Sequence, residues 1–248
     1  MAYAEIHFHL LPGIDDGPAS IEESIALAAA AAAEGTRTIV TTPHVHPEHV
    51  TDVSILPDCV NEVGTRLAAS RIGVELLCGG EVDHRMVWRL SGSDLELIAH
   101  GPPGRRWVLL EAPFAGLDDA YTTAADELRE RGFGVVVAHP ERALGASDAW
   151  WRAVEHEIDA GSALQINAWS AAGRYGERVR TAALALLRRA PRAVVASDAH
   201  GRERMPALRL AQDALASAGV PDPERFLDAA PNRLLGHGLA ARADPLAA

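Results

Sequence analysis

The chain has few cysteines, few aromatic residues and a deficit of basic charge. Its two cysteines, Cys59 and Cys78, have no ligand-like spacing, which argues against a disulfide framework or a cysteine-rich zinc site and fits a reducing cytosol. There are 23 basic against 34 acidic residues, for a net charge of -11. Nucleic-acid surfaces need clustered Lys and Arg, so this balance argues against a nucleic-acid partner. A phosphorylated substrate stays open, because bound divalent cations would reverse the local field.

Long hydrophobic runs are also lacking. The longest weakly polar stretch, 25–33, is alanine-rich and too short to cross a bilayer. The first residues show neither the basic nor the apolar region of a signal peptide. We therefore expect a soluble, cytoplasmic protein without direct membrane insertion. No linker, low-complexity tract or repeat divides the chain, and 248 residues can bury a sizeable core, so we expect one domain over 1–248.

Short apolar runs alternate with helical patterns along the chain. Seven runs are typical of buried parallel strands: Ala4–Phe8, Thr38–Thr42, Val74–Leu77, Trp107–Leu110, Phe133–Ala138, Ala163–Ile166 and Ala193–Ala196. Helices are expected from the capping box at Ser20 to Gly35, and at 118–131, 149–160, 177–190 and 206–218. Repeated strand–helix units favour an α/β fold built as a parallel barrel.

Imidazoles and carboxylates follow the expected strands. They are His7 and His9 after the first, His44 after the second, Glu81 after the third, Glu111 after the fourth, His139 after the fifth, and Asp198 and His200 after the seventh. The carboxyl ends of barrel strands meet at one face, so these groups should converge there. Residues two apart in an extended segment point the same way, so His7 and His9 can bind one ion. This set predicts a multinuclear metallohydrolase.

The alternative is a polar strand edge with ordinary hydrogen bonds. This alternative is disfavoured, because a polar strand edge rarely needs three histidine-bearing strand ends and two acidic ones together. The remaining histidines lack the strand-end setting and are interpreted as surface or packing residues, with His46 as the first exception because it follows His44 in a loop. They are His46, His49, His84, His100, His156 and His237. Trp150 and Trp151 are interpreted as packing residues at a helix start.

Four segments resemble the polymerase-and-histidinol-phosphatase (PHP) superfamily. They are Ile6–Gly17 (IHFHLLPGIDDG), Thr41–His44 (TTPH), Ala138–Arg142 (AHPER) and Ala196–His200 (ASDAH). Within that superfamily the LPGIDDG and HPER segments resemble the bacterial manganese-dependent protein tyrosine phosphatases of capsule and exopolysaccharide systems. The resemblance covers residues 5–235.

This resemblance implies a distorted seven-stranded, TIM-like (β/α)7 barrel holding up to three divalent metal ions. By similarity, His7, His9 and Asp198 hold one ion, and Glu81 bridges it to a second that also takes Glu111 and His139. Asp16, His44 and His200 hold the third. Every matching position carries a suitable ligand. Nitrogen and oxygen donors without thiolate suit manganese, iron or zinc, and manganese is the family's habit.

Two arginines resemble the family's phosphate clamp, Arg142 and Arg204. The planar guanidinium matches phosphate with two parallel hydrogen bonds. With Asp198 and His200 they form the expected catalytic set. For Arg142 the alternative is a surface salt bridge with Glu141. The loop after His200 is one residue shorter than in the family, which leaves Arg202 as an alternative to Arg204.

The resemblance implies hydrolysis of a phosphotyrosine protein, a membrane-associated tyrosine autokinase of polysaccharide export. Divalent ions would activate water for in-line attack, without a covalent phosphoenzyme. Neither cysteine is followed by the Gly-rich, Arg-ending loop of cysteine-dependent phosphatases. Alternatives are a small alkyl phosphate such as histidinol phosphate, and a metal-holding regulatory module, although no ligand is lost. Trp169 and Tyr175 either contact the substrate ring or pack in their loop.

Overall fold

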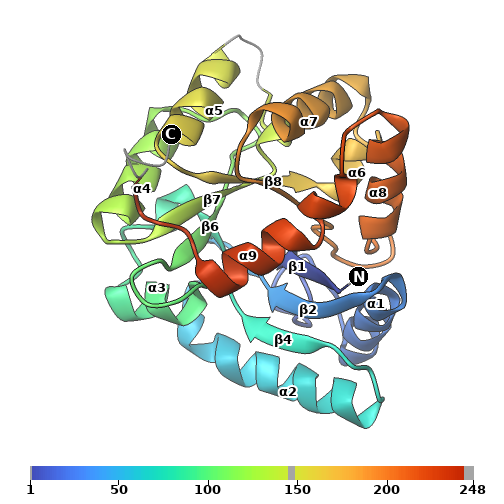
Figure 1. Cartoon of the computed structure of the whole chain (residues 1–248). Coiled ribbons are helices and arrows are strands. Elements are labelled where there is room, and N and C mark those ends of the chain that lie inside the picture. The colour runs from blue at the N-terminus through green and yellow to red at the C-terminus, as the bar shows by residue number, and fades with distance from the viewer. Residues whose placement is uncertain (1, 145–148, 243–248) are drawn as a thin grey trace.

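The computed structural model describes residues 2–144 and 149–242. Their strands are parallel and form two sheets surrounded by helices (Figure 1). The first sheet has the order β1-β2-β4, with β1 (Tyr3–Phe8), β2 (Thr36–Thr41) and β4 (Glu75–Cys78). The second has the order β3-β5-β6-β7-β8-β9, with β3 (His44–Val45), β5 (Glu81–Asp83), β6 (Trp107–Glu111), β7 (Gly134–Ala138), β8 (Ala163–Asn167) and β9 (Ala193–Ala196). The predicted α/β class with parallel strands is confirmed.

Two of the seven predicted strands are each followed by a further short strand that the sequence did not predict. The second, β2, is separated from β3 at Pro43, which has no N–H for a ladder hydrogen bond. The third, β4, is separated from β5 by Gly79 and Gly80. The closed barrel is not confirmed, because the described strands form two separate sheets. The single-domain assignment over 1–248 stays a prediction.

Backbone hydrogen bonds connect the two sheets at one edge, and the chain itself connects them at the other. On one side, the amide of Asp198 donates to the carbonyl of His7 at 3.1 Å, and the amide of His9 donates to the carbonyl of Ala199 at 2.9 Å. On the other side the chain itself joins the sheets, through Thr42 and Pro43 between β2 and β3 and through Gly79 and Gly80 between β4 and β5. The edge strands of the two sheets are therefore adjacent, and the residues after β1 lie beside those after β9.

Five predicted helices are present with ends within two residues of the prediction. They are α1 (Ile21–Glu34), α4 (Asp119–Glu130), α5 (Ala149–Asp159), α7 (Glu177–Arg189) and α8 (Leu208–Ser217). The Ser20 side chain caps α1 by accepting from the amide of Glu23, and Gly35 ends it at φ 112°. Further helices are α2 (Leu56–Ala69), α3 (Gly92–Ile98), α6 (Ala168–Ala171) and α9 (Ala229–His237). Short 3₁₀ turns are η1 (Val53–Ile55), η2 (His84–Met86), η3 (Pro140–Arg142) and η4 (Pro223–Phe226).

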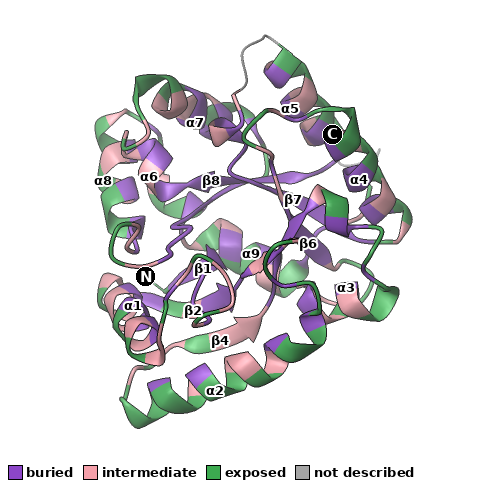
Figure 2. Cartoon of the chain, turned by 180° about the vertical axis from the view of Figure 1, so that it is seen from behind, coloured by how far each residue is buried: buried purple, intermediate pink, exposed green. Residues whose placement is uncertain are grey.

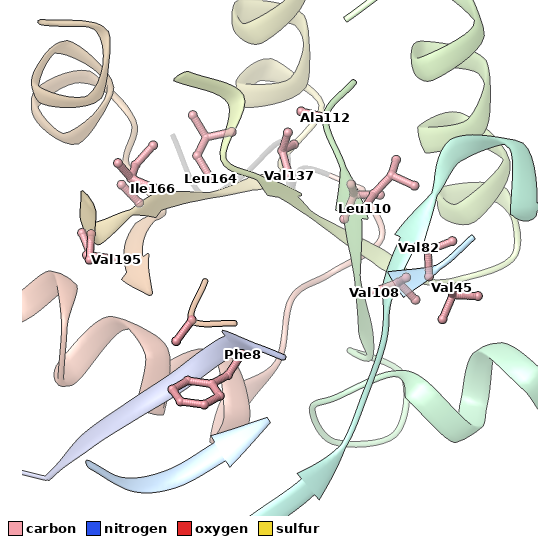
Figure 3. Packing of buried hydrophobic residues seen from close by; sticks show 14 of the residues in the cluster. Phe8, Val45, Val82, Val108, Leu110, Ala112, Val137, Leu164, Ile166 and Val195 are labelled. Carbon is pink, nitrogen blue, oxygen red and sulfur yellow. The ribbon is translucent and has the colours of Figure 1, made fainter. Parts of the chain in front are cut away.

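Alternate residues of the central strands enter two hydrophobic clusters. Val108 and Leu110 of β6 pack outward with side chains of the surrounding helices (Figure 3), whereas Trp107 and Leu109 join an inner cluster. Figure 2 shows β6, β7 and β8 mainly buried, β4 mainly of intermediate burial, and the outer helix faces exposed. At the amino end of β6, the Trp107 indole donates to the carbonyl of Leu234 in α9 at 2.9 Å. Helix α9 thus covers this end of the strands, and the carboxyl ends remain for a site.

No helix among the residues 2–144 and 149–242 combines the length and the apolar character that a membrane span requires.

Substitution of Gly79 by alanine should destabilise the fold. A Cβ at Gly79 would lie 2.6 Å from Val40 Cγ1 and 3.1 Å from the Thr41 carbonyl oxygen, so β2 and β4 would have to separate. We expect a loss of about 1–3 kcal/mol in the free energy of unfolding, measured by urea denaturation. Gly64→Ala is the control, because that helical position has open space and should gain about 1 kcal/mol. Equal effects at both positions would contradict this packing argument.

Candidate metal centre

All nine sequence-predicted metal ligands lie together at the carboxyl ends of the strands. Each belongs to at least one of four overlapping groups whose donor atoms lie within 4.8 Å of one another. The groups are His7, His9 and Asp198; His7, Glu81 and His139; His44, Glu81 and Glu111; and His9, Asp16, His44 and His200. The first and last groups contain the sets implied for two of the ions. Glu111 and His139 lie in separate groups, both of which include Glu81.

Two of these residues occupy a different strand position from the predicted one. His44 and Glu81 begin the short strands β3 and β5, instead of following a strand, and they are paired in register. Glu111 ends β6 and is paired with Ala138, the residue before His139. The parallel register therefore aligns these side chains at one edge.

The contact distances match the edges of a metal coordination polyhedron. The Nε2 atoms of His7 and His9 are 3.2 Å apart, and they lie 3.2 and 3.3 Å from Oε2 of Glu81. The same nitrogens lie 3.4 and 3.6 Å from Oδ1 of Asp198. Ligands bound about 2.1 Å from one ion are separated by about 3.0–3.4 Å in octahedral or tetrahedral geometry. His7, His9 and Asp198 therefore fit one divalent cation, with Glu81 beside it.

Glu81 provides a second test of this fit. Its side chain is 1% exposed, and Oε2 has no hydrogen-bond partner of acceptable geometry. A buried carboxylate oxygen without a donor is costly. Yet this atom is surrounded by imidazole nitrogens of His7, His9 and His44, the last at 3.1 Å. A cation in the middle would satisfy the carboxylate and the imidazoles together.

The pKa shifts within the cluster also indicate a site that favours positive charge. Burial lowers the pKa of His7, but the charges of Glu81 and Asp198 outweigh it and raise this pKa to about 9. The pKa of His44 rises to about 12 against burial, again mainly through Glu81. Burial and the neighbouring charge of Glu81 raise the pKa of Glu111 to about 8. Protons on these groups supply positive charge that a metal ion would otherwise supply.

Two residues orient the histidines from behind. Nδ1 of His7 donates to Oε1 of Gln165 at 2.9 Å, and Nδ1 of His9 donates to Oδ2 of Asp15 at 2.7 Å. Both imidazoles therefore direct the Nε2 lone pair into the cluster, as a metal ligand requires. Asp15 also accepts from the amide of His44 at 3.0 Å. The sequence did carry a signal for both residues. Gln165 is a polar residue inside a buried strand, and Asp15 directly precedes the predicted ligand Asp16.

Left-handed backbone turns place two of the predicted ligands. His139 has φ 35° and Asp198 has φ 49°, a region that non-glycine residues rarely adopt. Each lies just beyond a strand, β7 or β9, where the chain leaves the sheet. The Trp150 indole holds the first turn by donating to the carbonyl of Pro140 at 2.8 Å. The second is held through Ser197, whose amide donates to Oε2 of Glu5 at 2.8 Å.

Both predicted arginines reach Asp198. Nη1 of Arg142 donates to Oδ2 at 3.0 Å, and Nη2 of Arg204 donates to Oδ1 at 3.2 Å. Asn167, at the end of β8, adds a hydrogen bond to Oδ2 at 2.7 Å. Arg142 thus pairs with Asp198, whereas Glu141 is buried and accepts from the amide of Asn167. The surface salt bridge considered for Arg142 is not what forms.

The loop after β9 distinguishes Arg204 from Arg202. Arg204 contacts the imidazole of His200 as well as Asp198, while Arg202 is exposed. Both line a pocket of about 460 Å³ together with Asp16, Gly17, Glu23, His200, Gly201 and Glu203. The pocket adjoins the cluster at its exposed side, where Asp16 is 55% exposed. Arg204 is therefore the arginine that lies in the site.

The cysteines lie apart from this chemistry. Cys59 in α2 and Cys78 in β4 pack against the hydrophobic core. Burial raises both thiol pKa values, that of Cys78 to about 11. A nucleophilic cysteine needs the opposite shift. The prediction of two core thiols is confirmed.

The side chains interpreted as packing residues mostly do pack. Trp150 is buried and supports the turn after His139. His100 packs against the ring of Trp107 at 5.3 Å. His46 belongs to none of the four metal groups found among the described residues and lies 3.5 Å from Asp83. The indole of Trp169 in α6 donates to the carbonyl of Met205 at 2.9 Å, so this ring packs against the segment between β9 and α8.

Parallel strands with a buried cluster of imidazoles and carboxylates, flanked by two arginines, define an α/β protein with a candidate multinuclear metal centre. The chain belongs to the capsular polysaccharide synthesis CpsB/CapC family, whose sequence model matches residues 3–225. The resemblance deduced from the motifs is confirmed.

The chain is similar to named tyrosine-protein phosphatases in sequence and in structure. The tyrosine-protein phosphatase YwqE of Bacillus subtilis is 31% identical over 206 residues, covering 79% of this chain and 76% of the relative. The putative tyrosine-protein phosphatase CapC of Staphylococcus aureus is 29% identical, covering 82% and 78%. A crystal structure from work on YwqE and on CpsB of Streptococcus pneumoniae, described as unique metal-dependent tyrosine phosphatases, superposes with a TM-score of 0.78. It is 25% identical and covers 94% of this chain and 93% of that one.

Metal binding should release protons. Because the pKa values of His7 and His44 are raised to about 9 and 12, both imidazoles are protonated in the metal-free protein at about pH 7.5, and a ligand must lose that proton. Apparent affinity should therefore rise as the pH approaches 9 and weaken as it falls. Calorimetric titration with Mn²⁺ in buffers of different ionisation enthalpy counts the protons. His7→Ala should release fewer protons and His84→Ala should match the wild type. Binding without proton release would contradict the site.

Proposed function

We propose that this chain is a metal-dependent phosphatase that hydrolyses phosphotyrosine in proteins. The observation that carries the proposal is the convergence of nine nitrogen and oxygen donors with two arginines on one edge of the sheets. Its membership of the CpsB/CapC family and the phosphatases among its relatives support the same activity. No thiol lies in the site, so the chemistry does not use cysteine.

The same proposal covers the ions and the fold around them. We assign His7, His9, Asp16, His44, Glu81, Glu111, His139, Asp198 and His200 as ligands of up to three divalent ions, with manganese as the metal, although iron and zinc suit the donors equally. Divalent ions supply an activated water near neutral pH and neutralise charge on the phosphoryl oxygens. The two sheets would act as one distorted seven-stranded barrel, because β2 with β3 and β4 with β5 each occupy one strand position.

The arginines hold and orient the phosphoryl group in this mechanism. Arg142 and Arg204 both donate to Asp198. With Asp198 serving as a ligand of a divalent ion, the N–H donors of the two arginines would hold two phosphoryl oxygens. Asn167 keeps the carboxylate in place through its bond to Oδ2. The phosphate is thereby fixed for in-line attack by water.

The products follow from the bond that breaks. Water adds to phosphorus while the bond to the phenolic oxygen breaks, giving inorganic phosphate and tyrosine. A phenol has a pKa of about 10, so this leaving group needs less help from a general acid than an alkyl alcohol does. We propose a membrane-associated tyrosine autokinase of polysaccharide export as the substrate, on the strength of the family's role in capsule synthesis.

Activity should require divalent metal and an intact cluster. The purified protein should release phosphate from 4-nitrophenyl phosphate and from a phosphotyrosine peptide after loading with Mn²⁺, and a chelator should abolish this reversibly. Asp198→Ala and His139→Ala should remove activity and remain folded by circular dichroism, while His84→Ala should keep it. Thiol-modifying reagents should have little effect. Absence of aryl-phosphate turnover with Mn²⁺, Fe²⁺ and Zn²⁺ would refute the proposal, and preferred turnover of histidinol phosphate would change its substrate.

Removal of Arg142 should mainly weaken phosphate binding. Charge-assisted hydrogen bonds of this kind are worth about 1.5–3 kcal/mol, so Arg142→Ala should raise the Michaelis constant by about tenfold or more. Arg142→Lys should recover only part of the loss, since lysine lacks the planar fork. Arg204→Ala should behave similarly, with the exposed Arg202→Ala as its matched control. Steady-state kinetics with 4-nitrophenyl phosphate decide this, and an unchanged Michaelis constant would place Arg142 outside the phosphate site.

A further inference from the structure

The guanidinium of Arg142 is held between two aromatic rings. Its Cζ lies 4.7 Å from the ring centre of Phe114 and 4.6 Å from that of Tyr175. These distances are typical of cation–π contacts. The three residues come from different segments: Phe114 follows β6, Arg142 ends η3 after β7, and Tyr175 lies between α6 and α7 after β8. Three successive strand ends therefore contribute to one stack, which we call the Phe114–Arg142–Tyr175 stack.

Phe114 is also in contact with the metal cluster. Its ring is stacked on the imidazole of His139, with centroids 5.9 Å apart and an interplanar angle of 15°. His139 in turn bonds to Glu81 through Nε2 at 2.9 Å. One aromatic side chain thus touches both the arginine assigned to phosphate and a residue assigned to the metals.

The exposure of Phe114 is unusual for such a position. Phe114 is 57% exposed, whereas the two side chains that it contacts are largely buried. The side chain of Arg142 is 15% exposed and that of His139 is 2% exposed. The contacts with Arg142 and His139 cover only part of the ring. A large apolar surface is therefore left open directly beside the polar site.

We infer that Phe114 is a specificity-determining residue that contacts the aromatic ring of an aryl phosphate substrate. The inference rests on the proposed phosphatase function and adds the residue that selects the substrate. In phosphotyrosine one oxygen separates the ring from phosphorus. A phosphoryl group bound by Arg142 therefore brings the substrate ring within reach of a side chain whose ring centre is 4.7 Å from that guanidinium.

The phosphoryl group and the ring of the substrate are recognised by different kinds of side chain, and this difference explains the selectivity. Metal ions and arginines bind the phosphoryl group of any monoester equally, so they do not distinguish an aryl from an alkyl phosphate in the binding step, although the phenolic leaving group departs more easily. An offset or edge-to-face contact between two aromatic rings can distinguish them, because an alkyl chain offers no ring to pair with. Tyr175 is half-buried on the other side of Arg142 and acts as a positioning residue for the guanidinium.

The test separates binding of the ring from binding of the phosphate. Competitive inhibition of 4-nitrophenyl phosphate turnover gives inhibition constants for free phosphotyrosine, free phosphoserine and inorganic phosphate. Phe114→Ala should raise the Michaelis constant for aryl phosphate and the phosphotyrosine constant by about two- to tenfold, the range for aromatic pairs. The phosphoserine and inorganic phosphate constants should change less than the phosphotyrosine constant. Phe114→Trp should retain the preference, and Phe114→Leu should lose most of it.

The controls locate the effect. Leu210→Ala removes a comparably exposed apolar side chain, 43% exposed on α8, and should change none of these constants. If Phe114→Ala raises all three inhibition constants equally, the ring only braces Arg142 and the inference is overturned; an unchanged phosphotyrosine constant also overturns it. Failure of the wild type to hydrolyse any aryl phosphate would instead overturn the proposed function, and that is measured before the variants.

Discussion

The charge of two buried carboxylates governs the organisation of this molecule. Glu81 and Asp198 are 1% and 2% exposed, and both face imidazoles instead of solvent. Such groups are tolerated only if positive charge is placed among them. The raised pKa values of His7 and His44, and the two arginines that donate to Asp198, are consistent with that demand. A bound cation would meet it as well.

The rest of the fold makes this arrangement possible. Helix α9 and the inner hydrophobic cluster fill the amino ends of the strands, so stability is concentrated away from the site. The carboxyl ends can then carry features that cost free energy, including left-handed turns at His139 and Asp198. Trp150 and Glu5 hold these turns from positions that are themselves buried.

Sequence reasoning predicted that eight of the donors would gather, because the carboxyl ends of parallel strands meet at one edge, and the family resemblance added Asp16. It missed β3 and β5, since they are two and three residues long, too short for any periodic pattern. It also passed over Gln165 and Asp15, whose roles depend on contacts with His7 and His9. Phe114 carried no signal at all, because an aromatic residue in a loop acquires meaning only from its neighbours in space.

The metal cluster and the Phe114–Arg142–Tyr175 stack have different roles in the site: the first acts on the phosphoryl group, and Phe114 in the second recognises the ring. Cations and guanidinium groups act on the phosphoryl oxygens, which are identical in every phosphate monoester, so they bind aryl and alkyl phosphates alike. The leaving group affects the rate of bond cleavage, whereas discrimination in binding has to come from groups that touch the leaving side of the molecule. Phe114 is exposed beside Arg142 and His139, and it is therefore placed to couple recognition of the ring to the position of the phosphate. Selectivity then resides in a loop side chain that can change while the metal ligands stay the same.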